Sequence, residues 1–263
     1  MGPAALFASR FEKSAQRVKE RLAAYVAEPE NDEKVHDVRT ALRRLEASFL
    51  LMPKKLRRRN RRQIDAHKQF FRANSRVRDY DIIRGRIAAR AQGDLLAQLV
   101  ADLDKKRKAE AERAVSVAGL VSVLRAASLK GLKDDELECR VGEVAGRLLR
   151  KVKEGLPTVV ADRRNVEELH QLRKDLKKLR YVLEAMPGGL KKPYEKKVSK
   201  ILKGKKAEER LKELQDMLGT IHDIDITIQY LASLRRKAAA PVIVGEKAER
   251  DALFDRFAKD VRP

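Results

Sequence analysis

The chain has 263 residues, of which 61 are lysine or arginine and 39 are aspartate or glutamate, so its formal net charge is +22. Hydrophobic residues make up 43% of it, which is enough for a core and excludes a disordered chain. The single cysteine, Cys139, excludes an internal disulfide scaffold, and no apolar run approaches the ~20 residues of a membrane span. We therefore expect a soluble, cytoplasmic protein without membrane insertion.

Apolar residues recur at three- and four-residue steps along nearly the whole chain, without sustained two-residue alternation. This pattern predicts an all-α fold of about eight helices, half of them in residues 1–130 and half in residues 131–263. Asn31 and Asn165 each precede an acidic first turn, which predicts that they cap helices. The predicted breaks between helices are, in chain order, Glu28-Pro29, Met52-Pro53, Gln92-Gly93, Lys130-Gly131, Gly155 to Pro157, Met186 to Gly189 and Ala240-Pro241.

The two halves of the chain repeat each other. The segment HDVRTALRRL at 36–45 matches HQLRKDLKKL at 170–179, and a Met-Pro dipeptide follows each copy. A basic run comes next in both halves, KKLRRRNRR at 54–62 and KKPYEKK at 191–197. These matches predict an internal duplication, with one four-helix bundle in 1–130 and a second in 131–263, related by a pseudo-twofold axis.

A strip of potential cations lies beside the apolar stripe of each repeated helix. In the first copy the strip comprises His36, Arg39 and Arg43, spaced at three and four residues. In the second copy it comprises His170, Arg173, Lys177 and Arg180. Because unpaired like charges beside a core are costly, we expect the strips to line a groove that receives an anion. Arginine binds phosphate oxygens bidentately and lysine adds a point charge, so a phosphate polymer fits this composition.

The repeated motif resembles the CHAD family, the conserved histidine α-helical domain. The resemblance covers essentially the whole chain and is carried by VHDVRTALRRLEASFLLM at 35–52, FFRANSRVRDYDII at 70–83, LHQLRKDLKKLRYVLEAM at 169–186 and LKELQDMLGTIHDIDI at 211–226. It implies two four-helix bundles around a basic central channel that binds inorganic polyphosphate. Because the chain lacks the ExExK signature of triphosphate-tunnel enzymes, we expect a non-enzymatic binding module, in the cytoplasm and at polyphosphate granules where these form.

The resemblance also implies which residues face the polyphosphate. By position they are His36, Arg39, Arg43, Arg44, Arg76, Arg78, His170, Arg173, Lys177, Lys178, Arg180 and His222. We expect no catalytic residue, metal or cofactor. His67 has no counterpart in the second half and is predicted to be a surface or packing residue, and structural roles are predicted for Asp79, Asp81, Asp223 and Asp225.

Nucleic acid is an alternative partner, because its phosphate backbone would also be attracted to a charge of +22. The chain has only 7 phenylalanines, 5 tyrosines and no tryptophan, which leaves little for stacking on single strands. The sequence contains no recognised DNA-reading motif. Nucleic-acid binding therefore stays open as the weaker alternative.

A metal-dependent phosphohydrolase is a further alternative. The dipeptide His-Asp occurs at 36–37 and again at 222–223, and phosphohydrolases of the HD type use such residues as metal ligands. However, Arg39 and Arg43 follow His36 at three and seven residues and would repel a metal cation. Retained metal together with hydrolysis of phosphoanhydrides would favour this alternative.

Overall fold

The computed structural model describes residues 1–90, 94–122, 127–204, 206–236 and 239–261. Within these residues the chain is all-α, as predicted, and contains ten helices and no strand. They are α1 (Pro3–Ala27), α2 (Asp32–Leu51), α3 (Lys54–Arg59), α4 (Arg61–Arg90), α5 (Asp94–Ser122), α6 (Asp134–Ala161), α7 (Val166–Ala185), α8 (Gly188–Leu202), α9 (Ala207–Ser233) and α10 (Ala240–Val261).

Most of the predicted breaks coincide with the ends of helices, but one prediction was wrong. The segment from Gly155 to Pro157 lies inside α6, which continues to Ala161, so this break falls at 162–165 instead. Val152, Leu156 and Val159 are all buried on this helix, so packing of the last turns outweighs the backbone hydrogen bond that a proline removes. The predicted break at 92–93 lies outside the described residues.

Two further breaks were missed, which is why the structure has more helices than expected. The first separates α3 from α4 at Asn60, a buried residue whose side-chain amide donates to the carbonyls of Leu56 and Ser128 at 2.9 and 2.8 Å. The second ends α8 at Lys203, which adopts a left-handed conformation with φ of 53°. A buried side chain that bonds to a distant carbonyl, or a single left-handed residue, can end a helix where hydrophobic periodicity gives no signal.

The two predicted asparagine caps differ. The side chain of Asn31 accepts hydrogen bonds from the backbone N–H groups of Glu33 and Lys34, so this prediction is confirmed. Asn165 precedes α7 but makes no capping hydrogen bond, because its amide instead donates to the carbonyl of Thr158 at the end of α6. That side chain therefore fixes the turn between α6 and α7 rather than the start of α7.

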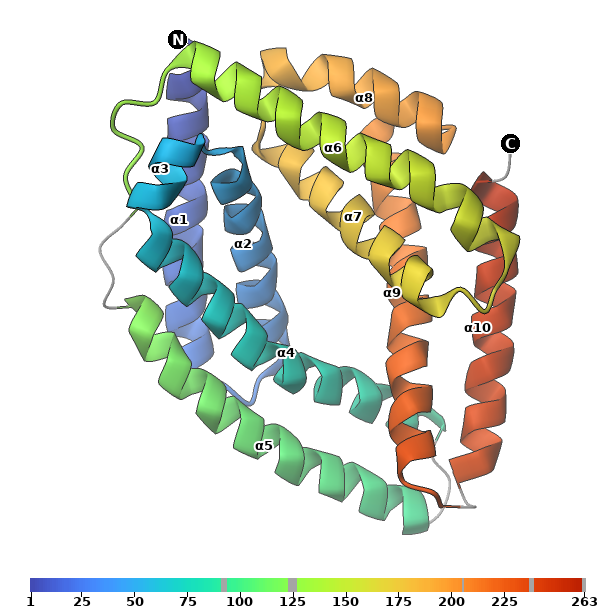
Figure 1. The fold of residues 1–263 in the computed structure, drawn as a ribbon. Helices are drawn as coiled ribbons and strands as arrows, with labels where there is room; N and C mark the ends of the chain where they lie inside the picture. The colour runs from blue at the N-terminus through green and yellow to red at the C-terminus, as the bar shows by residue number, and fades with distance from the viewer. Residues whose placement is uncertain (91–93, 123–126, 205, 237–238, 262–263) are drawn as a thin grey trace.

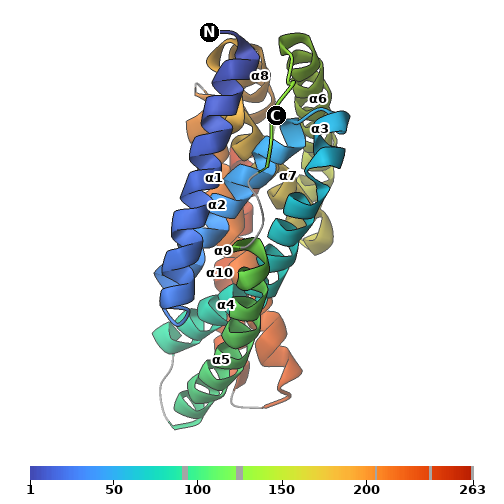
Figure 2. The same cartoon turned by 90° about the vertical axis from the view of Figure 1, so that its left-hand side faces the viewer.

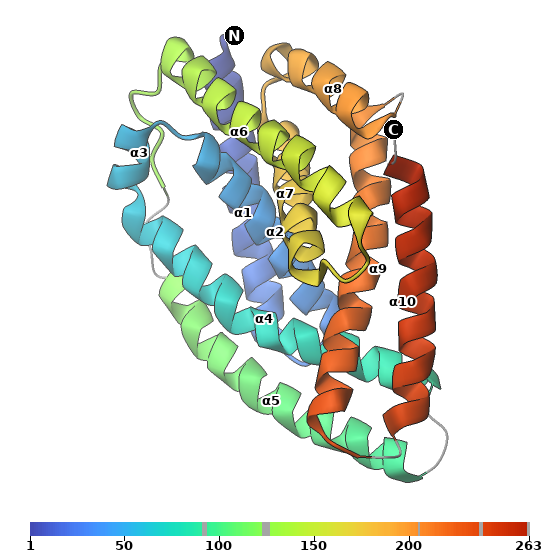
Figure 3. The same ribbon diagram turned by 45° about the vertical axis from the view of Figure 1, so that its right-hand side comes forward.

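Four inner helices connect the two halves of the chain. Helix α2 packs against α7, and α4 packs against α9. The remaining long helices lie outside them, with α1 along α2, α5 along α4, α6 along α7 and α10 along α9 (Figures 1 and 3). Figure 2 shows from the side that α1 and α2, and α4 and α5, run as neighbours over much of their length. The inner helices therefore form the boundary between the halves.

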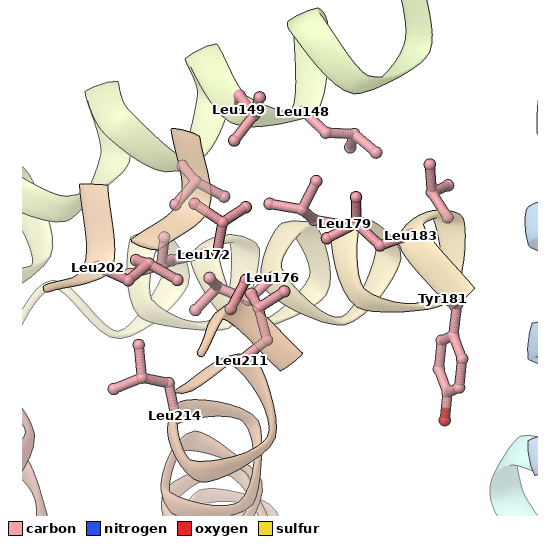
Figure 4. Close-up of a cluster of buried hydrophobic side chains, with 14 of the residues drawn as sticks. Leu148, Leu149, Leu172, Leu176, Leu179, Tyr181, Leu183, Leu202, Leu211 and Leu214 are labelled. Atoms are coloured by element: carbon pink, nitrogen blue, oxygen red, sulfur yellow. The ribbon is translucent and has the colours of Figure 1, made fainter. Parts of the chain in front are cut away.

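Each half builds most of a hydrophobic core of its own. One core joins α1 to α5, and the other joins α6 to α10 with a few residues of α1 and α2. Leucines from α6, α7 and α9 dominate the second core (Figure 4). A third, smaller cluster, which includes Ile87, Leu103 and Leu231, ties the far ends of α4 and α5 to α9 and α10. Two cores that face each other leave the space between the halves for polar side chains. The division of the chain at residue 130 stays a prediction.

Candidate anion-binding site

A cavity of about 820 Å³ lies between the halves, lined by residues of α2, α4, α7 and α9. We call it the central pocket. Among the described residues, nine lysines and arginines line it against four aspartates and glutamates. Eight of the predicted site residues are among its lining: His36, Arg39, Arg43, Arg78, Arg173, Lys177, Lys178 and His222. The fold therefore brings cations from both copies of the motif to one cavity.

The first copy of the motif holds its arginines against an aromatic ring of α4. Arg39 is 7% exposed and donates to the carbonyl oxygen of Phe71 and the hydroxyl of Ser75, both at 3.2 Å. Its guanidinium carbon lies 4.4 Å from the centre of the Phe71 ring, and that of Arg43 lies 5.2 Å from the same centre. These contacts leave Arg39 with few alternative positions, so its charge is fixed at the pocket wall before any anion arrives.

The second copy supplies Arg173 and Lys177 from α7 to the same pocket. Burial, with the nearby charges of Arg43 and Arg173, lowers the pKa of Lys177 to about 6. Burial and the neighbouring Arg43 also lower the pKa of Arg39, to about 9. The Nε atom of Arg173 is buried without a hydrogen-bond partner among the described residues. The pocket thus holds more positive charge than its own carboxylates neutralise.

Two aspartates of the repeated motif face these cations. Asp79 of α4 and Asp223 of α9 both line the pocket. Burial raises the pKa of Asp79, although Arg39 and His222 act in the opposite direction. Burial lowers the pKa of His222, and burial followed by the charge of Arg78 lowers that of His36, so both imidazoles favour their neutral form.

Four predicted site residues do not line the central pocket. Each contacts a carboxylate elsewhere: Arg44 lies 3.2 Å from Glu184, Arg76 lies 3.3 Å from Glu110, Arg180 lies 2.9 Å from Glu184, and His170 lies 2.9 Å from Asp225. In three of these pairs the carboxylate lies far from its partner in the sequence, so the motif gave no sign of the contact. Only Glu184 and Arg180 are close, four residues apart on one helix. Binding of an anion by these four residues stays a prediction.

Several pocket residues were not predicted as site residues. The largest group comes from α4 and includes Ile64, His67, Lys68, Phe71, Arg72 and Ser75, and α7 adds Tyr181. The lining residues of α4 follow one another at steps of one or three residues from 64 to 82, which places them on one face of the helix. This spacing could have predicted them from the sequence. His67 lines the pocket and also packs, since its ring lies 5.7 Å from that of Phe49. Figure 4 shows the ring of Tyr181 directed away from the leucine core.

The other two motif aspartates hold the helices together. Asp81 pairs with Arg107 of α5 at 2.5 Å, and Arg107 also donates to the carbonyl of Pro29. Asp225 pairs with Arg250 of α10 at 2.6 Å, and Arg250 donates to the carbonyl of Arg163. Each arginine thus joins an outer helix, an inner helix and the turn between the first two helices of its half. The same contact in both halves explains the second aspartate of the motif.

In the part of the chain that the structure describes, no group of three or more histidines, cysteines, aspartates or glutamates is arranged to hold a metal ion. No helix there is both long and apolar enough to span a membrane.

Comparisons with known proteins agree with this architecture. The family model described as the CHAD domain matches residues 9–232. The crystal structure of the CHAD domain from the plant Ricinus communis is similar, with a TM-score of 0.65 and 16% identity over 99% of this chain and 92% of that one. PptA from Streptomyces chartreusis is also similar, with a TM-score of 0.55 and 17% identity over 99% of this chain and 95% of that one. No curated protein matched. Since the family model spans most of its length, this chain belongs to the CHAD family.

Proposed function

We propose that the protein binds inorganic polyphosphate in the central pocket and acts as a binding module without enzymatic activity. The observation that carries this proposal is the convergence of Arg39 and Arg43 from α2 with Arg173 and Lys177 from α7 in one cavity. Two separate helices contribute equivalent positions of one motif, so the cations face a shared space from two sides. A linear chain of phosphates offers negative charge along its length and would contact both sides at once.

The chemistry of the pocket suits phosphate oxygens. Guanidinium groups donate paired hydrogen bonds in one plane, and these charge-assisted bonds are roughly twice as strong as neutral ones. Burial increases their strength because little water competes for them. Burial and the charges of Arg43 and Arg173 lower the pKa of Lys177 to about 6, and the negative charge of a bound polyanion would raise it again. Binding would then favour the protonated lysine.

The pocket suits nucleic acid less well than a phosphate chain. Phe71, one of the aromatic residues that line it, is already in contact with two cations, because the guanidinium carbons of Arg39 and Arg43 lie 4.4 and 5.2 Å from its ring centre. A ring that already contacts two guanidinium groups is less available for stacking with a base. Metal-dependent hydrolysis is less well supported too, because Asp37 of the first His-Asp dipeptide pairs with Arg21 of α1 at 2.7 Å.

A binding titration with long-chain polyphosphate tests the proposal. The variant R39A/R43A/R173A/K177A is expected to lose binding, while K192A/K196A/K197A/K200A, which removes the same number of charges from α8, is expected to bind like the parent protein. Circular dichroism checks that the pocket variant keeps its helices. A second pocket variant, R43Q/K177Q, retains the packing of Arg39. Equal binding by the pocket variants and the α8 control would contradict the proposal.

Two added measurements address the alternatives in the same samples. Long-chain polyphosphate should displace duplex DNA at a lower phosphate concentration than DNA displaces polyphosphate, and the reverse order would favour nucleic acid. Release of orthophosphate from polyphosphate during the titration would contradict a purely binding role. Binding of this kind would bring the protein to polyphosphate granules in cells that contain them.

A further inference from the structure

A second basic cavity lies outside the central pocket, between α3 and the first turns of α4. We call it the α3 cleft. It has a volume of about 260 Å³ and is lined by Lys54, Arg57, Arg58, Arg61, Ile64, Asp65 and Lys68. Five of these side chains are cations and one is a carboxylate, which lies 3.3 Å from the exposed Arg61. The cleft therefore keeps a clear excess of positive charge.

The α3 cleft adjoins the central pocket. Ile64 and Lys68, one helical turn apart on α4, line both cavities. The buried Ile64 forms a floor between them, and the exposed Lys68 provides a cation at the junction. An anion that reaches Lys68 from the central pocket therefore meets the cations of α3 next.

Cations of the other half of the molecule approach the same cleft. Arg140 and Arg147 of α6 lie close enough to Arg57 that their charges, after burial, lower its pKa. The Nε atom of Arg57 is buried and has no hydrogen-bond partner among the described residues. A side-chain donor held in this way is costly to leave without an acceptor. An anion in the cleft would provide the acceptor and relieve the repulsion.

The equivalent basic run of the second half is arranged differently. There Lys191 of α8 pairs with Glu195 at 3.1 Å and also contacts Glu208. The run from 54 to 62 contains no acidic residue, whereas the run from 191 to 197 includes Glu195. The excess of positive charge next to the pocket is therefore specific to α3, although both runs occupy the same place in the repeat.

We infer that a long polyphosphate chain leaves the central pocket past Ile64 and Lys68 and continues into the α3 cleft, which acts as a second subsite. This inference rests on the proposed function and adds the path that a long chain follows out of the central pocket. Chains too short to reach both cavities bind only in the pocket, while longer ones bind both. Because the second contact is then intramolecular, it increases affinity through a high effective concentration.

The test compares short and long chains on one variant. K54A/R58A/R61A removes three exposed cations of the cleft, and K192A/K196A/K200A removes three exposed lysines of α8 as the matched control. Long-chain polyphosphate should bind the cleft variant roughly a hundredfold more weakly than the parent protein, the lower end of the gain that a linked second site gives. Tripolyphosphate should bind the parent, the cleft variant and the control alike.

The possible outcomes separate the two proposals. Unchanged affinity for long chains in the cleft variant, or an equal loss in the α8 control, would overturn the subsite. An equal loss for tripolyphosphate and for long chains would also overturn it, because the residues would then act on the pocket itself. Failure of the parent protein to bind either chain would instead overturn the proposed function. Since all three substituted side chains are exposed, thermal unfolding should show the variant folded.

Discussion

Lys177 illustrates how burial changes the chemistry of a single side chain. A lysine in an unfolded chain titrates near 10.4, but inside the central pocket its pKa is about 6, because burial and the charges of Arg43 and Arg173 oppose its protonation. Between these two values the unfolded state binds more protons than the folded state. The contribution of Lys177 to the free energy of unfolding therefore increases as the pH rises from about 6 to about 10.4.

The same shift predicts that polyphosphate binding is coupled to proton uptake. A polyanion raises the pKa of Lys177, so the protein should take up a proton on binding between pH 7 and pH 9, and affinity should decrease as the pH rises. Histidines such as His36 and His222 titrate below this window, since burial lowers their pKa. Calorimetry in buffers of different ionisation enthalpy measures the uptake.

The K177R variant provides the control for this prediction. Arginine has a higher intrinsic pKa than lysine and keeps more of its charge in this window, so the variant should bind with less proton uptake and with a flatter pH profile. Proton release by the parent protein, or an affinity that increases with pH, would contradict the assignment of Lys177 to the anion site.

At the scale of helices, the buried pair between Asp81 and Arg107 ties α4 to α5. Their side chains are 4% and 8% exposed. Breaking such a pair leaves an uncompensated buried charge and costs about 3–5 kcal/mol of unfolding free energy. We expect R107A to lose about this much stability in urea-induced unfolding.

An exposed pair between the same two helices gives a matched control. Arg84 and Asp104 lie 3.2 Å apart, with side chains 50% and 49% exposed. Exposed ion pairs contribute about 0–1 kcal/mol to the free energy of unfolding, so R84A should change this free energy little. If R84A and R107A were equally destabilising, the structural role of Asp81 would have to be rejected.

The whole molecule carries a charge of +22, and nine of its lysines and arginines line one internal space with only four carboxylates. Self-repulsion of this charge opposes folding, and salt screens it. We therefore expect the melting temperature of the free protein to rise as salt is added, while its affinity for polyphosphate falls. A melting temperature that decreases over the same range, or an affinity independent of salt, would show that charge plays no such part.

Helices and their buried faces were predictable because both depend on local spacing. A residue three or four positions away lies on the same face, so the strip of His36, Arg39 and Arg43 could be located without knowing the fold. The repeated motif then indicated that two such strips exist. Breaks such as Asn60 were missed because their cause is a hydrogen bond to Ser128, far away in the sequence.

The amino-acid sequence by itself determined the all-α class, the repeat and the cations of the two motif helices, since periodicity and composition act within a helix. Only the tertiary structure decided which of those cations line the central pocket and which contact a carboxylate outside it. Arg44 and Arg43 are neighbours in the chain, yet Arg44 contacts Glu184 while Arg43 lines the pocket. The α3 cleft likewise exists because α3 packs against the first turns of α4. Ion pairs between helices depend on where distant segments are packed, and no local pattern records that.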